Sequence, residues 1–235
     1  MNAPSIPPRW LGFADAATLQ TAAVEAIAEA AETALRLRGR FDIVLAGGTT
    51  PKAIYAACRA LATDWSRWHC YFGDERCLPV DDPERNSVMA RSAWLDHVPI
   101  PAAQIHAIPA ELGATGGAVA YARTLSGAGS FDFVLLGLGE DGHTASLFPG
   151  HSWGEAANAA DALPVFNAPK PPPERVSMSA ARLSRARRVV FAVTGEGKRM
   201  AVNSWRAGNP LPAGAISADN AIEIFCEQGL LAPSH

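Results

Sequence analysis

Short apolar segments that alternate with longer amphipathic segments constrain the fold of this 235-residue chain more than any other feature. Phe41–Ala46, Trp68–Phe72 and Phe131–Leu136 are apolar runs rich in β-forming residues, which predicts buried strands. Asp15–Arg38 carries its apolar residues at a spacing close to 3.6, which predicts a long helix. Strands that alternate with helices indicate a sheet of parallel strands joined by crossover helices.

The alternation continues through the rest of the chain. Further helices are predicted at Pro51–Ala62, Arg85–Leu95, Leu112–Ser126 and Glu196–Ala207, and further strands at Leu163–Phe166, Arg175–Ser179, Arg188–Thr194 and Ala221–Cys226. We therefore expect an α/β fold, with a Rossmann-like, mostly parallel sheet and helices on both faces. The proline-rich stretch Ala168–Glu174 is too short to separate domains and predicts a stiff surface loop, so residues 1–235 are expected to form a single domain.

Composition and charge exclude several classes of protein. A chain that is 49% hydrophobic and 18% charged is not disordered. A net charge of −3 argues against a nucleic-acid partner, and the basic stretch Arg182–Arg188, which lacks interleaved aromatic residues, is interpreted as a solvated helix end. No run approaches the roughly 20 apolar residues of a membrane helix, so no membrane partner is expected.

The N-terminus and the cysteines favour a cytoplasmic protein. Met1–Leu11 lacks the basic start and apolar run of a signal peptide, and its prolines predict an irregular lead-in. The cysteines form neither a C-x-x-C pair nor the dense framework of a disulfide-rich domain. We expect four reduced, mostly buried thiols and no structural metal site; they are Cys58, Cys70, Cys77 and Cys226.

The first candidate site follows the strand that ends at Ala46. Gly47 and Gly48 allow a tight turn, Thr49 or Thr50 is suited to cap the next helix, and Pro51 fits its first turn. Because the N–H groups at a helix start are free, such a turn can bind an anion. The spacing of a Walker A loop is absent.

The second candidate site is Gly73–Arg76, directly after the strand WHCYF. Charged residues at the end of a buried strand are costly unless they are solvated or bind a ligand. Arg76 could hold a phosphate or carboxylate with two hydrogen bonds, and Asp74 could accept hydrogen bonds from sugar hydroxyls.

The third candidate site is the glycine-rich segment Gly137–Pro149, which contains a literal G-x-G-x-x-G. We reject a dinucleotide site because Pro149 interrupts the helix that this fingerprint requires, and because Glu140 and Asp141 would repel a pyrophosphate. Asp141 and His143 instead form a candidate carboxylate–imidazole pair with His143 as the base, since a carboxylate can fix the tautomer of a neighbouring imidazole. Both can reach one cleft if Gly142 adopts an unusual backbone conformation.

The fourth candidate site is Thr194–Arg199, where glycines again separate an apolar strand from a helix. Lys198 lies in the first helical turn, where a cation is unfavourable against the helix dipole. A bound anion explains this placement better than helix stability does.

These four segments together resemble the glucosamine-6-phosphate isomerase/6-phosphogluconolactonase family. LAGGTTP, FGDER, LLGLGEDGHTASLFPG and VFAVTGEGK occur in the order and spacing of that family, from about Phe41 to Arg199. The resemblance implies a Rossmann-like fold and, for the lactonase branch, hydrolysis of 6-phospho-D-glucono-1,5-lactone to 6-phosphogluconate in the oxidative pentose phosphate pathway. It implies no cofactor and no metal, because a lactone is already an activated ester.

The resemblance also implies a role for each residue that matches a family motif. His143 corresponds to the general base and Asp141 to its neighbour. Asp74 corresponds to an acidic residue near the sugar ring. The positions that correspond to phosphate-binding residues are Gly47, Gly48, Thr49, Thr50, Arg76 and Lys198.

Two other functions remain as alternatives to the lactonase. The related deaminase carries a glutamate where this chain has Phe148, and a tyrosine where it has Arg76, so both positions favour the lactonase. A sugar-phosphate-binding protein without catalysis is disfavoured by the intact Asp141–His143 pair. Residues 177–182 depart from the usual family pattern, which leaves open whether Arg182 reaches the phosphate. We expect a monomer.

Overall fold

The computed structural model describes residues 6–232, and its strands form one large parallel sheet and one small antiparallel sheet. The large sheet has the strand order β1-β10-β9-β6-β2-β3-β5, and every pairing in it is parallel. Its strands are β1 (Arg9–Phe13), β2 (Phe41–Leu45), β3 (Trp68–Phe72), β5 (Ile105–His106), β6 (Phe131–Leu136), β9 (Ala186–Val193) and β10 (Ala221–Glu227). The predicted fold class is therefore confirmed.

The centre of the large sheet is its most apolar part. All six residues of β6 are buried between β9 and β2, and apart from Asp132 they are apolar, so this strand lacks an alternating pattern. The edge strand β1 has only partly buried or exposed residues. The chain turns at the carboxyl ends of these parallel strands, so the loops that follow β2, β3, β6 and β9 lie at the same edge of the sheet.

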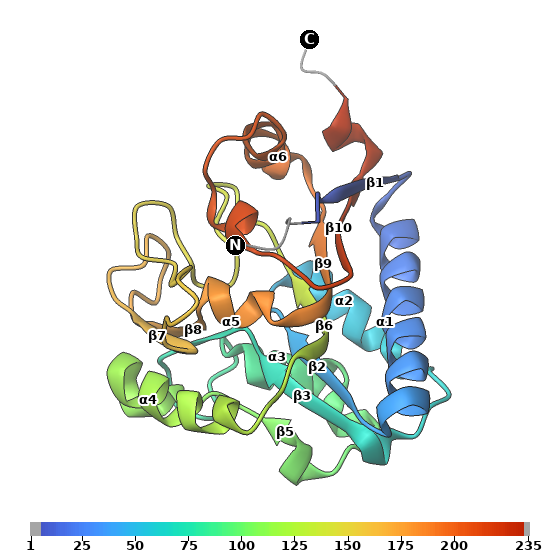
Figure 1. The fold of residues 1–235 in the computed structure, drawn as a ribbon, viewed down its shortest axis with the longest axis vertical. Helices are drawn as coiled ribbons and strands as arrows, with labels where there is room; N and C mark the ends of the chain where they lie inside the picture. Colours follow the sequence, from blue (N-terminus) through green and yellow to red (C-terminus); the bar gives the residue numbers. More distant parts are fainter. Residues whose placement is uncertain (1–5, 233–235) are drawn as a thin grey trace.

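The helices agree with the alternation of the sequence. They are α1 (Ala16–Arg38), α2 (Thr49–Cys58), α3 (Asn86–Ala93), α4 (Gly113–Ser126), α5 (Ala180–Ser184) and α6 (Arg199–Arg206). The long helix α1 begins after Asp15, whose carboxylate accepts a 2.8 Å hydrogen bond from the N–H of Thr18, and ends at Gly39 in the left-handed conformation. Figure 1 shows α1 along one side of the large sheet, with α4 and the small sheet on the other.

The small sheet was not expected as a separate unit. It contains β4 (Asp74–Arg76), β8 (Arg175–Met178) and β7 (Ala162–Val165), all antiparallel. Two of its strands were predicted from the sequence, but periodicity gave no sign that they leave the parallel sheet. The charged segment after β3 was not predicted to be a strand, whereas Asp74–Arg76 pairs with β8 and so joins the two sheets.

Three further local predictions are corrected by the structure. The lead-in was expected to be irregular; residues 1–5 lie outside the described part, and Arg9–Phe13 pairs with β10. The start of α2 was expected to carry a threonine cap, but its N-cap is Gly48 and no side chain caps it. The basic stretch 182–188 is not a solvated helix end, because Arg182 is buried and β9 begins at Ala186.

The cysteines lie as expected. All four are free thiols, and Cys58, Cys70 and Cys226 are buried while Cys77 is partly buried. Burial raises the pKa of the Cys58 thiol to about 12, which keeps it in the unreactive neutral form. Within residues 6–232, no helix combines the length and the apolar character that crossing a bilayer requires.

Candidate active site

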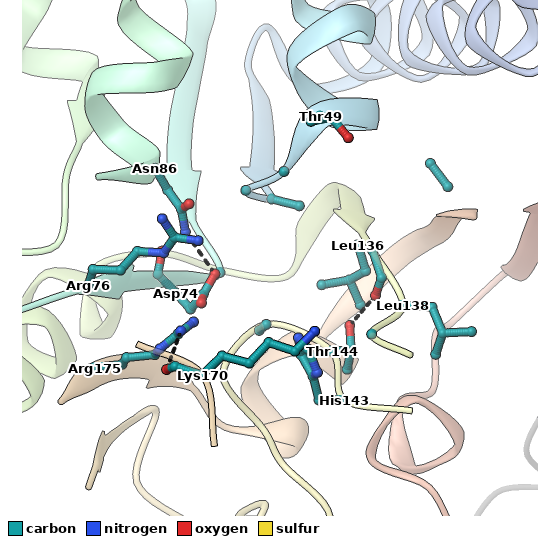
Figure 2. A pocket seen from close by; sticks show the side chains of 18 of the residues that line it. Thr49, Asp74, Arg76, Asn86, Leu136, Leu138, His143, Thr144, Lys170 and Arg175 are labelled. Atoms are coloured by element: carbon teal, nitrogen blue, oxygen red, sulfur yellow. Dashed lines mark hydrogen bonds between the residues drawn. The ribbon is translucent and has the colours of Figure 1, made fainter. Parts of the chain in front are cut away.

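A cavity of about 320 Å³ lies at the carboxyl ends of the central strands. Its walls come from the loops after β2, β3, β6 and β9 and from the proline-rich loop before β8. Seven of the nine predicted site residues line it, namely Gly47, Gly48, Thr49, Asp74, Arg76, His143 and Lys198. Figure 2 shows Asp74, Arg76 and Arg175 on one side of this cavity and His143 and Thr144 on the other. Segments far apart in the sequence therefore converge on one pocket.

The predicted contact between the Asp141 carboxylate and the His143 imidazole is present in the structure. His143 Nδ1 lies 2.5 Å from Asp141 Oδ1, and the backbone N–H of His143 donates to the same carboxylate oxygen at 3.2 Å. Burial raises the pKa of the Asp141 carboxyl, but the hydrogen bonds and the charge of His143 outweigh it, and the net pKa is lowered. The ionised Asp141 thus holds the Nδ1–H tautomer, which leaves the Nε2 lone pair of His143 free to take a proton.

Two glycines make this arrangement possible. Gly142 has a φ of +86°, the unusual conformation that the Asp-Gly-His spacing was predicted to need. A Cβ atom at Gly139 would lie 2.0 Å from His143 Nδ1 and 2.6 Å from Asp141 Oδ1, so only glycine fits beside the pair. Asp141 itself does not line the cavity and acts on it through His143.

The turn after β2 presents a helix start to the cavity. Gly47, Gly48 and Thr49 line the wall, and α2 begins at Thr49. The first N–H groups of this ten-residue helix have no intrahelical acceptor, and the helix dipole favours an anion there. Thr50 does not line the cavity, because its hydroxyl lies 2.6 Å from the hydroxyl of Thr194.

Four cations line the cavity without a carboxylate partner. Arg76, Lys170, Arg175 and Lys198 form no ion pair with any side chain of residues 6–232. Burial lowers the pKa of Lys198, against an opposing contribution from Glu140. Charges held near one another without counterions are expensive unless a ligand neutralises them, so this wall favours an anion.

Lys170 and Arg175 were not singled out by the sequence analysis. Lys170 lies in the stretch 168–174, which was interpreted only as a stiff surface loop, and Arg175 is the first residue of the strand predicted at Arg175–Ser179. Arg175 Nη2 donates to the carbonyls of Lys170 and Pro171 at 3.0 and 3.1 Å, and Arg175 Nε donates to Pro172 at 3.2 Å. The loop backbone therefore fixes the guanidinium in the cavity wall.

Arg182 lies away from the cavity. Its guanidinium packs 3.8 Å over the ring of Phe131 and donates to the carbonyls of Ala128 and Gly129. It is 1% exposed and does not line the pocket, so it does not contact a ligand bound there. The question left open by the sequence is answered: Arg182 is a structural residue.

Phe148 is one of the two positions at which the sequence resemblance favoured the lactonase over the related deaminase. It is buried, and its ring lies 4.8 Å from the ring of His143 between centroids. The guanidinium of Arg175 lies 5.6 Å from the centre of the Phe148 ring. A side chain without a titratable group thus packs against His143, and it can orient the imidazole but cannot transfer a proton.

The chain matches a family model described as glucosamine-6-phosphate isomerases/6-phosphogluconolactonase over residues 14–225. It is 37% identical over 231 residues to a 6-phosphogluconolactonase of Mycobacterium tuberculosis, covering 91% of this chain and 93% of the relative. It is 41% identical over 180 residues to a 6-phosphogluconolactonase of a Nostoc species, covering 73% of each chain.

Solved structures agree with these sequence relatives. The 6-phosphogluconolactonase of Trypanosoma brucei has a TM-score of 0.86 at 26% identity, covering 96% of this chain and 98% of the other. The enzyme of Thermotoga maritima has a TM-score of 0.86 at 25% identity, covering 94% of this chain and 100% of the other. The chain therefore belongs to the glucosamine-6-phosphate isomerase/6-phosphogluconolactonase family.

Proposed function

We propose that the protein hydrolyses 6-phospho-D-glucono-1,5-lactone to 6-phosphogluconate, the lactone-opening step of the oxidative pentose phosphate pathway. The observation that carries this proposal is the Asp141–His143 pair, which shares one cavity with four unpaired cations. The names of the relatives at 36–42% identity support the same substrate. A base beside an anion-binding wall suits a phosphorylated ester.

The phosphate is anchored by the start of α2 and by the unpaired cations. The N–H groups at the start of α2, beside Gly48 and Thr49, can donate to the anion, and Lys198 and Arg76 supply positive charge. Lys170 and Arg175 add to this charge from the proline-rich loop. An anchored phosphate fixes the position of the lactone carbonyl, so that the water and the ester meet in one geometry.

His143 acts as the general base in this proposal. Its Nε2 takes a proton from a water molecule as the water oxygen attacks C1 of the lactone, and the carbonyl π electrons move to the oxygen. The tetrahedral intermediate then collapses, the bond from C1 to the ring oxygen breaks, and protonated His143 returns the proton to the ring oxygen. Asp141 stabilises the imidazolium between these two steps.

The developing oxyanion requires a hydrogen-bond donor. The N–H groups of Gly139 and Gly142 donate within the loop, to His143 O and Gly139 O, and the N–H of His143 donates to Asp141. Arg76 donates one Nη to Glu84 O and keeps its Nε without a partner. The guanidinium of Arg76 and the remaining N–H groups of the Gly137–Gly142 loop are the two candidate donors.

A paired assay tests this function against the deaminase of the same family. Freshly generated 6-phosphogluconolactone is expected to release acid with the protein present, and glucosamine 6-phosphate is expected to release no ammonia. Ammonia release without lactone hydrolysis would overturn the proposal. A sensor without catalysis is tested by the same assay, since it would bind sugar phosphates and turn over neither.

We also propose that the protein works in the cytoplasm as a monomer, on a small-molecule lactone and without a nucleic-acid partner. The four free thiols support a reducing compartment, and the net charge of −3 does not favour nucleic acid. Sedimentation velocity tests the monomer directly, and a dimer at micromolar concentration would contradict it.

A further inference from the structure

Asp74 is held in the cavity wall by two neutral donors. Asn86 Nδ2 donates to Asp74 Oδ1 at 3.0 Å, and Ser146 Oγ donates to Asp74 Oδ2 at 2.5 Å. Asn86 Nδ2 also donates to the backbone carbonyl of Asp74 at 3.0 Å. Each carboxylate oxygen has two acceptor positions, so one donor on each leaves acceptor positions that a ligand in the cavity can use. Figure 2 shows Asn86 directed at Asp74 across the wall.

The two donors are themselves fixed. Asn86 is the first residue of α3, and its N–H donates to the buried carboxylate of Glu75 at 2.7 Å. Glu75 also accepts from the N–H of Ser87 at 2.8 Å, so it takes up the first N–H groups of that helix. Asn86 is 4% exposed, which leaves its side chain little freedom to turn.

Ser146 is held in place within the Gly137–Pro149 segment, which also carries Asp141 and His143. It is 1% exposed, and its N–H donates to Ser177 Oγ at 3.2 Å. The preceding residue, Ala145, has a φ of +47°, a conformation that a residue with a side chain rarely adopts. Strain of this kind persists where the surroundings impose it, and it clusters at functional sites. Here the strained residue directly precedes Ser146, whose hydroxyl donates to Asp74 and which lies three residues after His143.

Asp74 forms no ion pair, although cations line the same cavity. Arg76 and Arg175 line the cavity wall with Asp74, yet no ion pair joins it to either among residues 6–232. Asn86 and Ser146 each occupy one acceptor position on the carboxylate and hold it in place without an ion pair. The cations then stay available for a phosphate, and the negative charge stays available for a hydroxyl.

We propose that Asn86 and Ser146 are positioning residues that present the Asp74 carboxylate, in one orientation, to a hydroxyl group of the sugar ring. The proposal rests on the function proposed above and assigns specificity for the ring hydroxyls to this three-residue unit. A site built to bind a hydroxyl rejects an analogue without it, because its polar groups are then left unpaired. Loss of either positioning residue is therefore expected to weaken the discrimination between hydroxylated and deoxygenated lactones.

The test compares 6-phosphogluconolactone with its 2-deoxy, 3-deoxy and 4-deoxy forms. The wild-type protein is expected to prefer the parent lactone in kcat/KM over at least one deoxy form by about 10-fold or more, as for a hydrogen bond to a charged group. In Asn86→Ala and Ser146→Ala this preference is expected to fall by about 2- to 10-fold. Ser184→Ala, which removes a hydroxyl bonded to Ala180 O, is the matched control and is expected to keep it.

Two results would overturn the assignment. One is a wild-type protein that accepts all three deoxy lactones as well as the parent. The other is a fall in kcat/KM of the same factor for every lactone in both variants, which is the result of a purely structural role. If Asn86→Ala does not fold, the discrimination between parent and deoxy lactones measured for Ser146→Ala tests the proposal by itself.

Calorimetry separates this inference from the proposed function. Ser146→Ala is expected to bind 6-phosphogluconate about 2- to 10-fold more weakly than the wild type and inorganic phosphate equally well. If the wild-type protein does not hydrolyse the parent lactone, the function fails, and this binding result still decides the role of Ser146. An unchanged affinity of Ser146→Ala for 6-phosphogluconate would exclude the proposed positioning role of Ser146.

Discussion

Arginines occur at both ends of the large sheet, but their partners differ. At the amino-terminal end, Asp132 lies between Arg38 and Arg187, with a backbone N–H as a further donor. In the same region Glu223 lies between Arg9 and Arg188. Both carboxylates are 4% exposed at the side chain, and each arginine named here has a carboxylate within ion-pair distance.

At the carboxyl-terminal end the charges are left unpaired. Lys170, Lys198, Arg76 and Arg175 have no carboxylate partner within residues 6–232, and Asp74 is held by neutral donors instead. Paired charges at the first end satisfy each other and fix the strand starts. Unpaired charges at the second end carry an unsatisfied electrostatic cost, which a bound phosphate would remove. We propose that this difference separates charges that serve folding from charges that serve a ligand.

The largest effect is expected at the base. His143→Ala removes the group proposed to activate water, so kcat should fall by about 10²- to 10⁴-fold. Affinity for inorganic phosphate should stay within about 2-fold of the wild type, because the cations remain. Steady-state kinetics and calorimetry measure the two quantities. A variant that keeps its kcat would remove His143 from the mechanism.

The next effect contrasts the two ends directly. Lys198→Ala and Arg175→Ala each remove a charge-assisted phosphate contact worth about 1.5–3 kcal/mol, which raises KM by roughly 10- to 150-fold. Arg187→Ala removes a paired arginine at the opposite end and should leave KM unchanged. Equal rises in KM for all three variants would break the comparison.

A stability measurement sharpens the other side of the comparison. Asp132→Asn keeps the side-chain shape but leaves Arg38 and Arg187 without their carboxylate, at an expected cost of about 1–3 kcal/mol in the free energy of unfolding. Urea denaturation measures this loss, and kcat/KM at a temperature where the variant is folded should match the wild type. Loss of activity without loss of stability would show that this end also serves catalysis.

The histidines near the amino-terminal end predict a dependence of stability on pH. His69 Nδ1 lies 3.2 Å from His106 Nε2, and burial, with the charge of Arg40 beside them, lowers the pKa of both below 6.5. As the pH falls below 6.5, the unfolded chain therefore binds more protons than the folded one. The contribution of the two neutral histidines to the free energy of unfolding is complete above pH 6.5, and it is lost as the pH falls through their lower folded-state pKa values.

The measurement is the unfolding free energy at about pH 7.5 and about pH 5.5. His106→Gln should reduce the difference between the two values, because it removes one of the two depressed groups. His97→Gln is the control, since His97 is exposed and bonded to the carbonyl of Ser92. An undiminished difference in His106→Gln would exclude the pair as its source.

The smallest effect compares two neighbouring threonines at the start of α2. Thr49 lines the cavity, so Thr49→Val should raise KM by about 2- to 10-fold, the value of one neutral hydrogen bond. Thr50 is bonded to Thr194 outside the cavity, so Thr50→Val should change KM by less than about 2-fold. The reverse order would place the phosphate on the other side of the turn.

Local chemistry made much of this molecule predictable from its sequence. The strands Trp68–Phe72 and Phe131–Leu136 have the predicted bounds, because parallel strands that are buried on both faces consist mostly of apolar, β-forming residues. The Asp-Gly-His segment indicated its own geometry, since only a glycine at position 142 lets the carboxylate and the imidazole meet. Glycines and charges at strand ends marked seven residues that do line the cavity.

Contacts between distant segments decided the rest. The segment Asp74–Arg76 is a strand because it pairs with β8. This pairing also brings Arg175 into the cavity wall beside Arg76, although the two residues are 99 positions apart in the sequence. Asn86 and Ser146 became partners of Asp74 across 12 and 72 positions of sequence. The sequence by itself determined most of the helices and strands and the Asp141–His143 pair, because these depend on neighbours along the chain. Only the tertiary structure decided which charges are paired, because pairing depends on which segments the sheets bring together.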